Sequence, residues 1–361
     1  MMQNKAVHPG RVSVYEWLRL IATLMVVLGH STYLRISTQY GYLNHVSALE
    51  WLAPVYYGFF FDRVRVTALL IYQFHMPVFF FLSGAVLHLK PIGPLKPFVQ
   101  KKARRLILPY YLCGLLFMLP VKIFTGFYTP ENLPKGIWGF LVGGSDSGHL
   151  WFLAGLFWCM VVFALLQKTA ERFLAKHSGM QVFVLLAIGA VVQLCAERMP
   201  FELLGIVRGL QYFFWFCLGY AFEPLRHKHA VGSTTHAAAL LATVTLFWVA
   251  GSRLGMLGSC TTAFVGCVWT YLLALVCSRV FAPLEQTRLY RLLTASLFAV
   301  YLYHDPLEHL VLWLTVQTRF AASNAGCWLY LLARTVGVMV AAILMDRGLQ
   351  WLAGRITEKK N

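Results

Sequence analysis

The stretch that decides the fold is EWLRLIATLMVVLGHS, residues 16–31, an apolar run that carries an arginine and a histidine. Its length approaches the roughly 20 residues that an α-helix needs to cross the hydrocarbon core of a bilayer. Similar runs recur along the 361 residues, of which 59% are hydrophobic and only 12% charged. Soluble domains usually carry about a quarter charged residues. The composition therefore predicts an integral membrane protein.

The apolar runs predict an all-α polytopic membrane protein with about ten transmembrane helices. The predicted spans are 14–34, 67–88, 105–126, 149–167, 180–196, 204–222, 236–252, 259–280, 293–316 and 327–346. The first run is too polar for the apolar core of a signal peptide, so we expect it to remain as the first helix. No change of composition marks an appended soluble domain, and residues 1–361 are expected to form a single transmembrane domain.

The net charge of +17 raises the question of a nucleic-acid partner. When both termini are placed in the cytoplasm, most of the 31 lysines and arginines fall on the inner side, as the positive-inside rule predicts. The segment KPIGPLKPFVQKKARR, residues 90–105, contributes six of these cations and no acidic residue. Topology and contact with membrane lipids therefore explain the basicity, and we expect no nucleic-acid partner.

The eight cysteines fall almost entirely inside predicted helices, without CxxC spacing, so we expect neither a metal site nor a disulfide framework. The long outer segment 126–149 is rich in Gly and Pro and carries the aromatic residues Phe127, Tyr128, Trp138 and Phe140. Such rings suit stacking on sugars or anchoring at the membrane interface, and the sequence leaves both interpretations open.

Arg19 and His30 share one face of the first helix. Their spacing of eleven residues, at about 100° per residue, ends about 20° from a whole number of turns. Glu16 and Thr23 fall on the same stripe. A charge facing lipid at depth costs at least about 2.5 kcal/mol, so this stripe must face protein or a water-filled cavity. A purely structural interpretation, in which Arg19 pairs with Glu16 and His30 bonds to a neighbouring helix, stays open.

Two motifs follow in the next two predicted helices. FHMPVFFFLSG, residues 74–84, contains His75 beside a helix-kinking Pro and ends in the small pair Ser83 and Gly84, for which close helix packing is a sufficient explanation. KKARRLILPYY, residues 101–111, places four cations, Lys101, Lys102, Arg104 and Arg105, at the inner mouth of the third helix. These cations suit either membrane anchoring or binding of phosphate groups.

Two further motifs carry ionisable groups toward the membrane. GHLWFL, residues 148–153, places His149 and Trp151 at an outer mouth. YLYHDPLEHL, residues 301–310, places His304 and Asp305 inside the ninth span, together with Glu308 and His309. Ionisable groups at membrane depth indicate function by default, although Asp305 and His309 have the spacing to neutralise each other.

These motifs, in this order, resemble the acyltransferase 3 family of ten-helix membrane enzymes. FHMPVFFFLSG is most similar to the branch of fucose 4-O-acetylase-like enzymes and exopolysaccharide acetyltransferases of the xanthan type. The resemblance implies transfer of an acyl group, usually acetyl, from cytoplasmic acyl-CoA to a sugar hydroxyl at the inner membrane of a bacterium. It implies acetyl-CoA as co-substrate and no metal. The acceptor would be a glycan, lipid-linked or polymeric, with polysaccharide-biosynthesis machinery as a further partner.

The resemblance also implies roles for residues of this chain. Arg19 and His30 match the family pattern of an arginine, ten residues and a catalytic histidine, and Glu16 stands where many members have aspartate. The basic cluster matches an Arg-x-x-Arg motif at the CoA entrance, with lysine as its first member, so the pair is Lys101 with Arg104 or Lys102 with Arg105.

The residues themselves suit such a reaction. His30 could act as a general base or carry the acyl group covalently, while Arg19 holds the donor or balances charge. Ser83 is expected near the donor path. The candidates for positioning substrate or His30 are His75, His149, Trp151, His304 and Asp305.

Three alternatives remain open on sequence alone. The protein could be a transporter that uses Arg19, Arg208 and Arg334 to move an anionic metabolite or glycan. It could be an assembly subunit without chemistry of its own. Within the enzyme class, it could transfer succinyl rather than acetyl groups.

Overall fold

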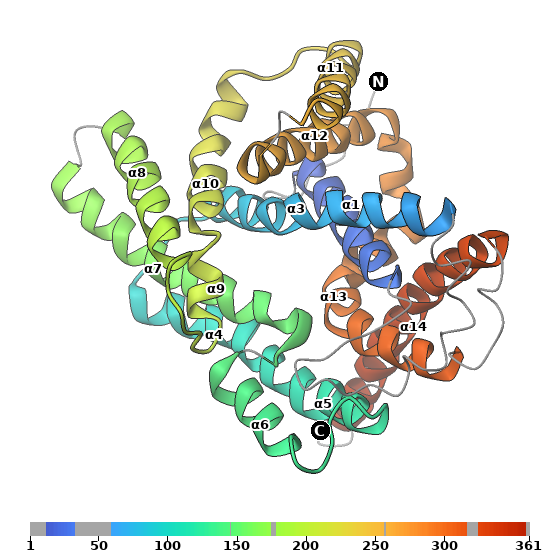
Figure 1. Ribbon diagram of the computed structural model, residues 1–361. Helices are drawn as coiled ribbons and strands as arrows, with labels where there is room; N and C mark the ends of the chain where they lie inside the picture. The colour runs from blue at the N-terminus through green and yellow to red at the C-terminus, as the bar shows by residue number, and fades with distance from the viewer. Residues whose placement is uncertain are drawn as a thin grey trace.

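The computed structural model describes residues 12–32, 59–144, 146–174, 178–255, 258–315 and 324–358. Within these ranges the chain forms helices and no strand, which confirms the all-α prediction (Figure 1). The helices are α1 (Ser13–Ser31), α3 (Phe59–His88), α4 (Leu95–Cys113), η2 (Gly114–Met118), α5 (Leu119–Phe124), α6 (Leu133–Trp138), η3 (Gly139–Gly143), η4 (Gly148–Leu150), α7 (Trp151–Leu174), α8 (Ser178–Ala196), α9 (Ile206–Leu210), α10 (Phe213–Lys228), α11 (Thr234–Arg253), α12 (Ser259–Val280), η5 (Ala282–Gln286), α13 (Arg288–Thr315) and α14 (Asn324–Glu358).

Seven segments in the described part of the chain are long and apolar enough to cross a membrane. They are Ala68–His88, Leu95–Phe124, Leu133–Ala170, Gly179–Ala196, Thr234–Arg253, Ser259–Val280 and Ala325–Arg355. The other three predicted spans correspond to α1, to α9 together with α10, and to α13. Helix α10 has only 16 residues, and α1 and α13 carry the ionisable groups of the stripe and of YLYHDPLEHL. A multi-pass membrane protein is supported, while the number of ten spans and the cytoplasmic termini stay predictions.

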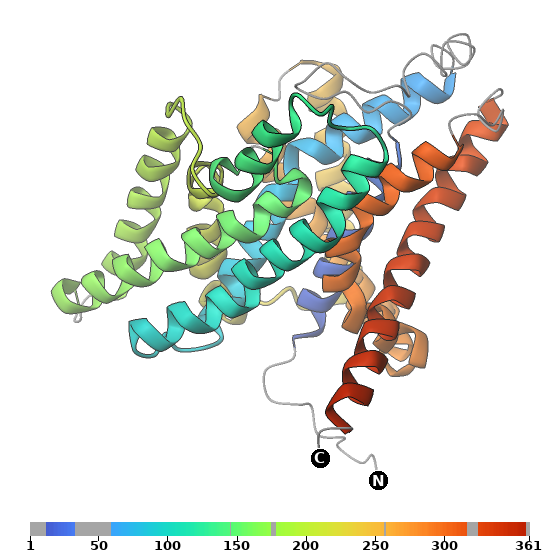
Figure 2. The ribbon, with the colours of Figure 1, turned by 90° about the horizontal axis from the view of Figure 1, so that it is seen from below.

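Helices α1 and α3 cross near the middle of the molecule. In Figure 1, α11 and α12 lie above them, α7 and α8 on the left, and α13 and α14 on the lower right. Figure 2 shows the N-terminal end of α1 and the C-terminal end of α14 pointing toward the same edge. Helix α1 is therefore packed among other helices, and within its polar stripe Thr23 is buried while Arg19 remains exposed.

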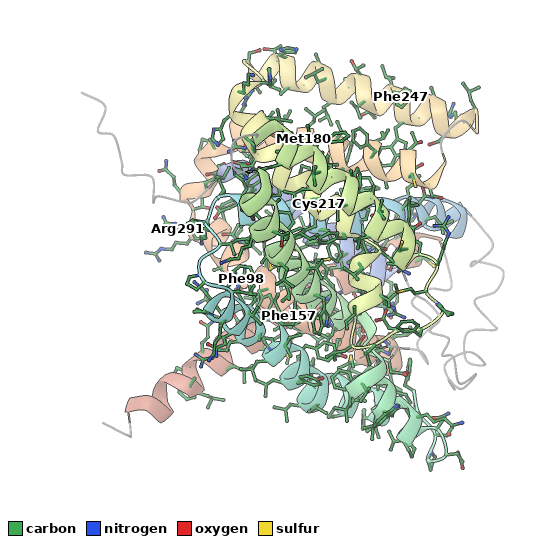
Figure 3. The ribbon with its side chains drawn as sticks, turned by 90° about the vertical axis from the view of Figure 1, so that its left-hand side faces the viewer. Phe98, Phe157, Met180, Cys217, Phe247 and Arg291 are labelled. Carbon is green, nitrogen blue, oxygen red and sulfur yellow. The ribbon has the colours of Figure 1, made fainter. Side chains whose placement is uncertain are left out.

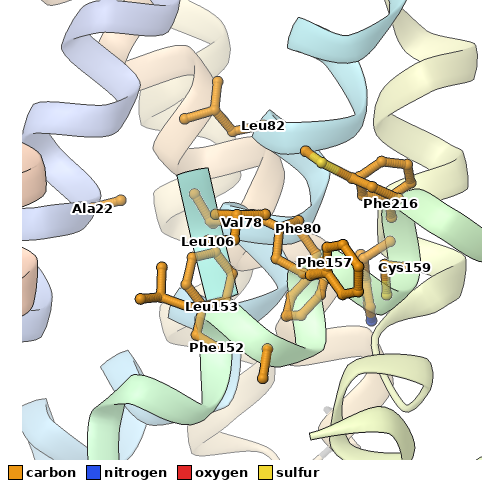
Figure 4. Packing of buried hydrophobic residues seen from close by; sticks show 14 of the residues in the cluster. Ala22, Val78, Phe80, Leu82, Leu106, Phe152, Leu153, Phe157, Cys159 and Phe216 are labelled. Atoms are coloured by element: carbon orange, nitrogen blue, oxygen red, sulfur yellow. The ribbon is translucent and has the colours of Figure 1, made fainter. Parts of the chain in front are cut away.

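A large aromatic core joins α1, α3, α4, α7 and α10 (Figure 4). Phe80 is fully buried at its centre. The centroid of its ring lies 5.1 Å from that of Tyr212 in a stacked pair and 5.2 Å from that of Phe152 in an edge-to-face pair. Offset and edge-to-face ring pairs of this kind add to the stabilisation from burial alone. The outer helices differ, because α8 and α11 expose apolar side chains such as Met180 and Phe247 (Figure 3). That exposure suits contact with lipid.

Two glycines set the crossing of α3 and α10. A Cβ on Gly84 would lie 2.0 Å from the carbonyl oxygen of Phe216, and a Cβ on Gly219 would lie 1.8 Å from that of Phe81. The two glycines also hold the same place in the similar stretches FFFLSGAVL and FWFCLGYAF. Only glycine permits backbones to approach this closely, so close packing accounts for Gly84.

The structure corrects several predicted boundaries. Helix α4 begins at Leu95, so the four cations of KKARRLILPYY lie within a helix instead of preceding it. Pro94 is the N-cap residue of α4 and Pro97 lies in its first turn, where proline is tolerated. The predicted span 204–222 is divided into α9 and α10. The predicted outer segment 35–66 lies mostly outside the described residues, apart from the start of α3 at Phe59.

The segment 126–149, which the sequence analysis predicts on the outer side, contains α6 and the π-helical turn η3 among its described residues. Phe140 is fully buried and stacks 4.9 Å from the ring of Tyr110, whose hydroxyl donates a 2.7 Å hydrogen bond to the carbonyl of Phe140. Tyr128 is buried as well, whereas Trp138 is exposed. Phe140 and Tyr128 are thus core residues, and neither sugar stacking nor interfacial anchoring describes them.

Candidate active site

The polar side chains converge on one buried carboxylate, that of Asp305. Its Oδ1 lies 3.1 Å from Nδ1 of His30, and its Oδ2 lies 3.2 Å from Nδ1 of His149 and 3.9 Å from Nε2 of His309. The side chains of His30 and Asp305 are only 13% and 11% exposed. Helices α1 and α13 and the turn η4 therefore bring three imidazoles to a single carboxyl group.

The alignment of α1 with α13 follows from the stripe on α1. Arg19 donates a 3.0 Å hydrogen bond to the carbonyl of Thr294, and eleven residues further along both helices His30 meets Asp305. The two helices thus run parallel with a constant offset. The periodicity that places Arg19 and His30 on one face also makes both face α13. Arg19 remains exposed beyond this contact, and Glu16 is partly buried one turn earlier.

His304 is fully buried between the other imidazoles. The centroid of its ring lies 4.8 Å from that of His30 and 4.9 Å from that of His149. Its Nδ1 bonds to the carbonyls of Val300 and Tyr301, at 3.1 and 2.8 Å. Because a carbonyl only accepts, Nδ1 carries the proton and Nε2 presents a lone pair. That Nε2 has no hydrogen-bond partner among the described residues.

The turn η4 is fixed to α13 on both sides of His149. Nε2 of His149 lies 3.0 Å from the carbonyl of Leu302, and the hydroxyl of Tyr301 donates a 2.6 Å hydrogen bond to the carbonyl of His149. Nε2 therefore donates to the carbonyl of Leu302, and Nδ1 lies 3.2 Å from Oδ2 of Asp305. Because both of these oxygens only accept, the ring donates to both of them only when it carries two protons.

A second buried carboxylate ties the end of α1 to α13 and α14. Ser31, the residue after His30, donates hydrogen bonds to the carbonyl of Val27 and to Oε1 of Glu308. Arg334 donates from Nε to Oε2 of the same Glu308, and both of these side chains are fully buried. Since this network includes the neighbour of His30, it holds that histidine in place opposite Asp305.

His75 has only an indirect contact with His30, and Trp151 lies in the aromatic core. Tyr72 lies between His75 and His30, with ring centroids 5.1 Å and 6.3 Å from them, and Nδ1 of His75 bonds to the carbonyl of Ile71 at 3.0 Å. Trp151 packs against Phe80 and Tyr212 in the aromatic core. His75 can therefore act on His30 through Tyr72, whereas the contacts of Trp151 are those of a core residue.

The basic cluster lies far from the histidines along the continuous helical segment α4–η2–α5. Lys101, Arg104 and Arg105 are exposed, and Lys102 lies 5.2 Å from the ring centroid of Phe98. At 1.5 Å per residue, Arg104 is roughly 27 Å along this segment from Lys122, which sits beside Asp305. The basic cluster thus lies near the N-terminal end of this helical segment, and the imidazoles around Asp305 lie near its C-terminal end. Ser83 is half-buried on α3, next to the crossing with α10.

Lys122 is a site residue that the sequence analysis missed. It lies on α5, its side chain is only 4% exposed, and its ammonium sits 4.6 Å from the ring centroid of Phe127. A Cβ on Gly148 would lie 3.3 Å from Nζ of Lys122 and 3.4 Å from Oδ2 of Asp305. A lysine inside the apolar stretch LPVKIF was the available signal, since ionisable groups at depth indicate function by default.

The arginines invoked for transport have partners in the structure. Nε of Arg208 lies 3.9 Å from Oε2 of Glu202, Arg334 is held by Glu308, and Arg19 bonds to the carbonyl of Thr294. Two of the three therefore already face a carboxylate. In the part of the chain that the structure describes, no group of three or more His, Cys, Asp or Glu side chains is arranged to hold a metal ion.

The fold and the site together define an all-α membrane protein whose imidazoles surround one buried carboxylate. A family model described as an acyltransferase domain matches residues 13–347. The chain therefore belongs to the acyltransferase 3 family, as its motifs predicted. No curated protein and no solved structure matches it.

Proposed function

We propose that this acyltransferase is a membrane O-acyltransferase that moves an acetyl group from cytoplasmic acyl-CoA to a sugar hydroxyl. The observation that supports it most is the 3.1 Å contact between Nδ1 of His30 and Oδ1 of Asp305. A carboxylate that accepts a hydrogen bond from Nδ1 fixes the tautomer in which Nε2 carries the lone pair that can take a proton.

The reaction then follows from this tautomer. Nε2 of His30 takes the proton of the acceptor hydroxyl while the hydroxyl oxygen attacks the thioester carbonyl. When the tetrahedral intermediate collapses, the carbon–sulfur bond breaks, and the imidazolium returns its proton to the CoA thiolate. In the covalent variant Nε2 attacks the thioester carbonyl, the carbon–sulfur bond breaks and CoA leaves as its thiolate. The acceptor hydroxyl then attacks the acetyl group on Nε2, the carbon–nitrogen bond breaks, and the proton of the hydroxyl passes to the thiolate. Both routes need His30 to be neutral at the start.

The donor is assigned to the opposite end of α4. Arg104 and Arg105, with Lys101 or Lys102 beside them, present exposed cations that suit the phosphates of CoA. From there the acyl arm runs toward His30 past Arg19, whose guanidinium is exposed about 16 Å along α1 from His30. Ser83 is assigned to the same path.

The acceptor is assigned to the outer side of a bacterial inner membrane. A glycan, lipid-linked or polymeric, would reach His30 at the C-terminal end of α1, and polysaccharide-biosynthesis machinery would deliver it. Asp305 and His149 line the same end of the site, so they are the groups assigned to orient His30 and the acceptor.

The test compares wild-type protein with His30→Asn, both in nanodiscs, with radiolabelled acetyl-CoA and cell-derived glycolipids as acceptors. Both proteins should be stabilised against heat by acetyl-CoA, because a ligand that binds the native state raises stability by mass action. Only the wild type should transfer label, with a loss of about 10²–10⁴-fold in the variant. Near wild-type transfer by His30→Asn would remove His30 from the mechanism. Absence of any thermal shift with acetyl- or succinyl-CoA would contradict the donor assignment.

A further inference from the structure

Phe127 is the aromatic residue of the segment 126–149 whose place is still to be described. Phe140 and Tyr128 are buried in the core, and Trp138 is exposed on α6. Phe127 follows the C-terminal end of α5 and is partly exposed. In Figure 2 this end of α5 lies at the edge of the molecule opposite to the N-terminal end of α1, which the predicted topology places inside. Phe127 therefore lies on the side from which the proposed acceptor comes.

The local structure at the end of α5 fixes the direction of the Phe127 side chain. Helix α5 ends at Phe124, and Gly126, two residues later, has a φ of +75°. The amide of Phe127 donates a 2.8 Å hydrogen bond to the carbonyl of Lys122. The amide of Gly126 donates at 3.1 Å to the carbonyl of Ile123. These two bonds form a Schellman motif, in which a left-handed glycine ends the helix and the side chain after it packs back on the last turn.

The ring of Phe127 consequently covers two buried groups beside Asp305. Its centroid lies 4.6 Å from Nζ of Lys122 and 5.7 Å from the centroid of the His309 ring. Nε2 of His309 lies 3.9 Å from Oδ2 of Asp305, whose Oδ1 contacts His30. Lys122 is 4% exposed and His309 8%, whereas Phe127 is only partly buried. A molecule that approaches Asp305 from this side therefore meets Phe127 first.

A second pair of rings continues this contact toward the outer end of α5 and α13. Trp313 lies one turn beyond His309 on α13, and the centroid of its ring is 4.7 Å from that of Phe124 on α5. Trp313 is partly exposed and Phe124 is 62% exposed. Phe127, Phe124 and Trp313 thus form an outer aromatic strip that begins beside the buried groups around Asp305 and ends at the surface.

We propose that the ring of Phe127 binds the acceptor sugar by stacking on the apolar C–H face of a pyranose, so that the hydroxyl to be acylated points toward His30. This inference rests on the proposed function. The face of an aromatic ring is negative and attracts hydrogens of C–H bonds, which carry a partial positive charge. Binding sites for small ligands combine apolar and aromatic walls with a few polar groups. Here Phe127 supplies the wall, and His30 and Asp305 supply polar groups. The rest of the outer aromatic strip suits a further sugar unit of the same glycan.

A purely structural role for Phe127, as the cover of Lys122, makes a different prediction. A cover needs an apolar side chain of sufficient size and acts on the folded state, so its loss lowers heat stability and impairs both substrates alike. A stacking surface needs the flat ring and acts on the acceptor alone. The two roles are therefore separated by a variant that keeps an apolar side chain and removes the ring.

The test measures the KM values of acceptor and donor separately for proteins in nanodiscs, with cell-derived glycolipids and radiolabelled acetyl-CoA. Phe127→Leu keeps the apolar cover without the ring, Phe127→Tyr keeps the ring, and Trp138→Leu is the matched control from the same segment. KM for the glycolipids should rise about 3- to 10-fold in Phe127→Leu, roughly the effect of losing one favourable ring contact. KM for acetyl-CoA and the midpoint of thermal unfolding should stay near wild type. Phe127→Tyr and Trp138→Leu should keep the acceptor KM within about twofold.

Three results would overturn the inference. The first is an unchanged acceptor KM in Phe127→Leu. The second is a rise in both KM values together with a loss of heat stability, which identifies Phe127 as a structural cover. The third concerns folding: if Phe127→Leu does not fold, Phe127→Met takes its place, and failure of both to fold also identifies a structural cover.

Equilibrium binding separates this inference from the proposed function. Tritium-labelled glycolipids are titrated onto the same proteins without acetyl-CoA, with empty nanodiscs as background. Wild-type protein that binds the glycolipids but transfers no acetyl group contradicts the proposed function alone, and Phe127→Leu should then still bind about 3- to 10-fold more weakly. Transfer by the wild type with equal binding in Phe127→Leu contradicts the inference alone. Wild-type protein that neither binds nor transfers overturns both.

Discussion

The two ends of helix α1 each meet a buried carboxylate, and the partners of these carboxylates differ. At the N-terminal end the hydroxyl of Tyr15 donates to Oε2 of Glu223, and Arg226 donates to both carboxylate oxygens, at 3.0 and 2.6 Å. At the C-terminal end Asp305 faces the imidazoles of His30, His149 and His309. Arginine and tyrosine are fixed donors at neutral pH, whereas imidazole changes its charge there.

This difference separates an anchor from a reactive centre. A bidentate arginine holds Glu223, and the ring of Tyr15, 5.3 Å from the guanidinium, packs on the same pair. Among the described residues, the imidazole that contacts Glu223 is that of His227, whose Nε2 lies 3.1 Å from Oε1 and whose side chain is 67% exposed, whereas the imidazoles at Asp305 are at most 13% exposed. Asp305 holds groups that can gain and lose a proton, and beside it Nε2 of His304 has no partner among the described residues. The comparison predicts that changes at the Asp305 end alter chemistry and that changes at the Glu223 end alter stability.

The largest effect is expected from Asp305→Asn. The amide would keep the shape of the side chain but present an N–H or a neutral oxygen to His30, so the imidazole loses the partner that fixes its tautomer. We expect acetyl transfer to fall by about 10³-fold, within the range for loss of general base catalysis. Thermal stabilisation by acetyl-CoA, measured on the same sample, should be retained. An Asp305→Asn variant with more than half of wild-type activity would contradict the assignment of the Asp305 cluster as the reactive centre.

At the other end, Arg226→Met should cost stability and spare the chemistry. Glu223 is 1% exposed and Arg226 18%, so this substitution leaves a buried carboxylate without its cation. Removing one partner of a buried pair costs about 3–5 kcal/mol, and we expect the lower end here because Arg226 is partly solvated. The measurement is the midpoint of thermal unfolding, with acetyl transfer per folded molecule as control. Arg226→Met combined with Glu223→Gln should recover part of the loss.

The basic end of α4 should affect donor affinity and little else. The double variant Arg104→Ala, Arg105→Ala removes two exposed cations that we assign to the CoA phosphates, and charge-assisted hydrogen bonds of this kind contribute about 1.5–3 kcal/mol each when fully formed. Because these side chains are exposed, we expect a rise of about 10-fold in KM for acetyl-CoA with kcat within a factor of about three. Arg355→Ala, another exposed arginine, is the matched control and should leave KM unchanged.

The smallest effect is expected from Ser83→Ala. This serine is half-buried and adjoins the crossing of α3 and α10, so loss of its hydroxyl should change transfer by less than about twofold, as for most substitutions away from special features. Gly84→Ala next to it is the contrast. Its new Cβ would lie 2.0 Å from the carbonyl of Phe216 and should lower stability by about 1–3 kcal/mol. A large loss of kcat in a stable Ser83→Ala protein would place this serine in the reaction.

Several features were predictable because they depend on composition or local spacing. The low charge content predicted helices in a membrane, and the ordered motifs predicted the acyltransferase 3 family. The sequence also placed His149 and Asp305 among the groups that could orient His30. The branch of the family, the donor and the acceptor stay predictions, since neither the fold nor the family match distinguishes among them.

What the sequence determined by itself was the stripe on α1, because a rotation of about 100° per residue is a property of the helix alone. Which helix lies opposite the stripe is decided by packing between segments some 275 residues apart, as the contact of His30 with Asp305 shows. The same holds for Lys122, whose burial and proximity to Asp305 depend on a glycine in η4. A lysine near the end of an apolar run can extend to the interface or turn inward, and only its tertiary neighbours decide between the two.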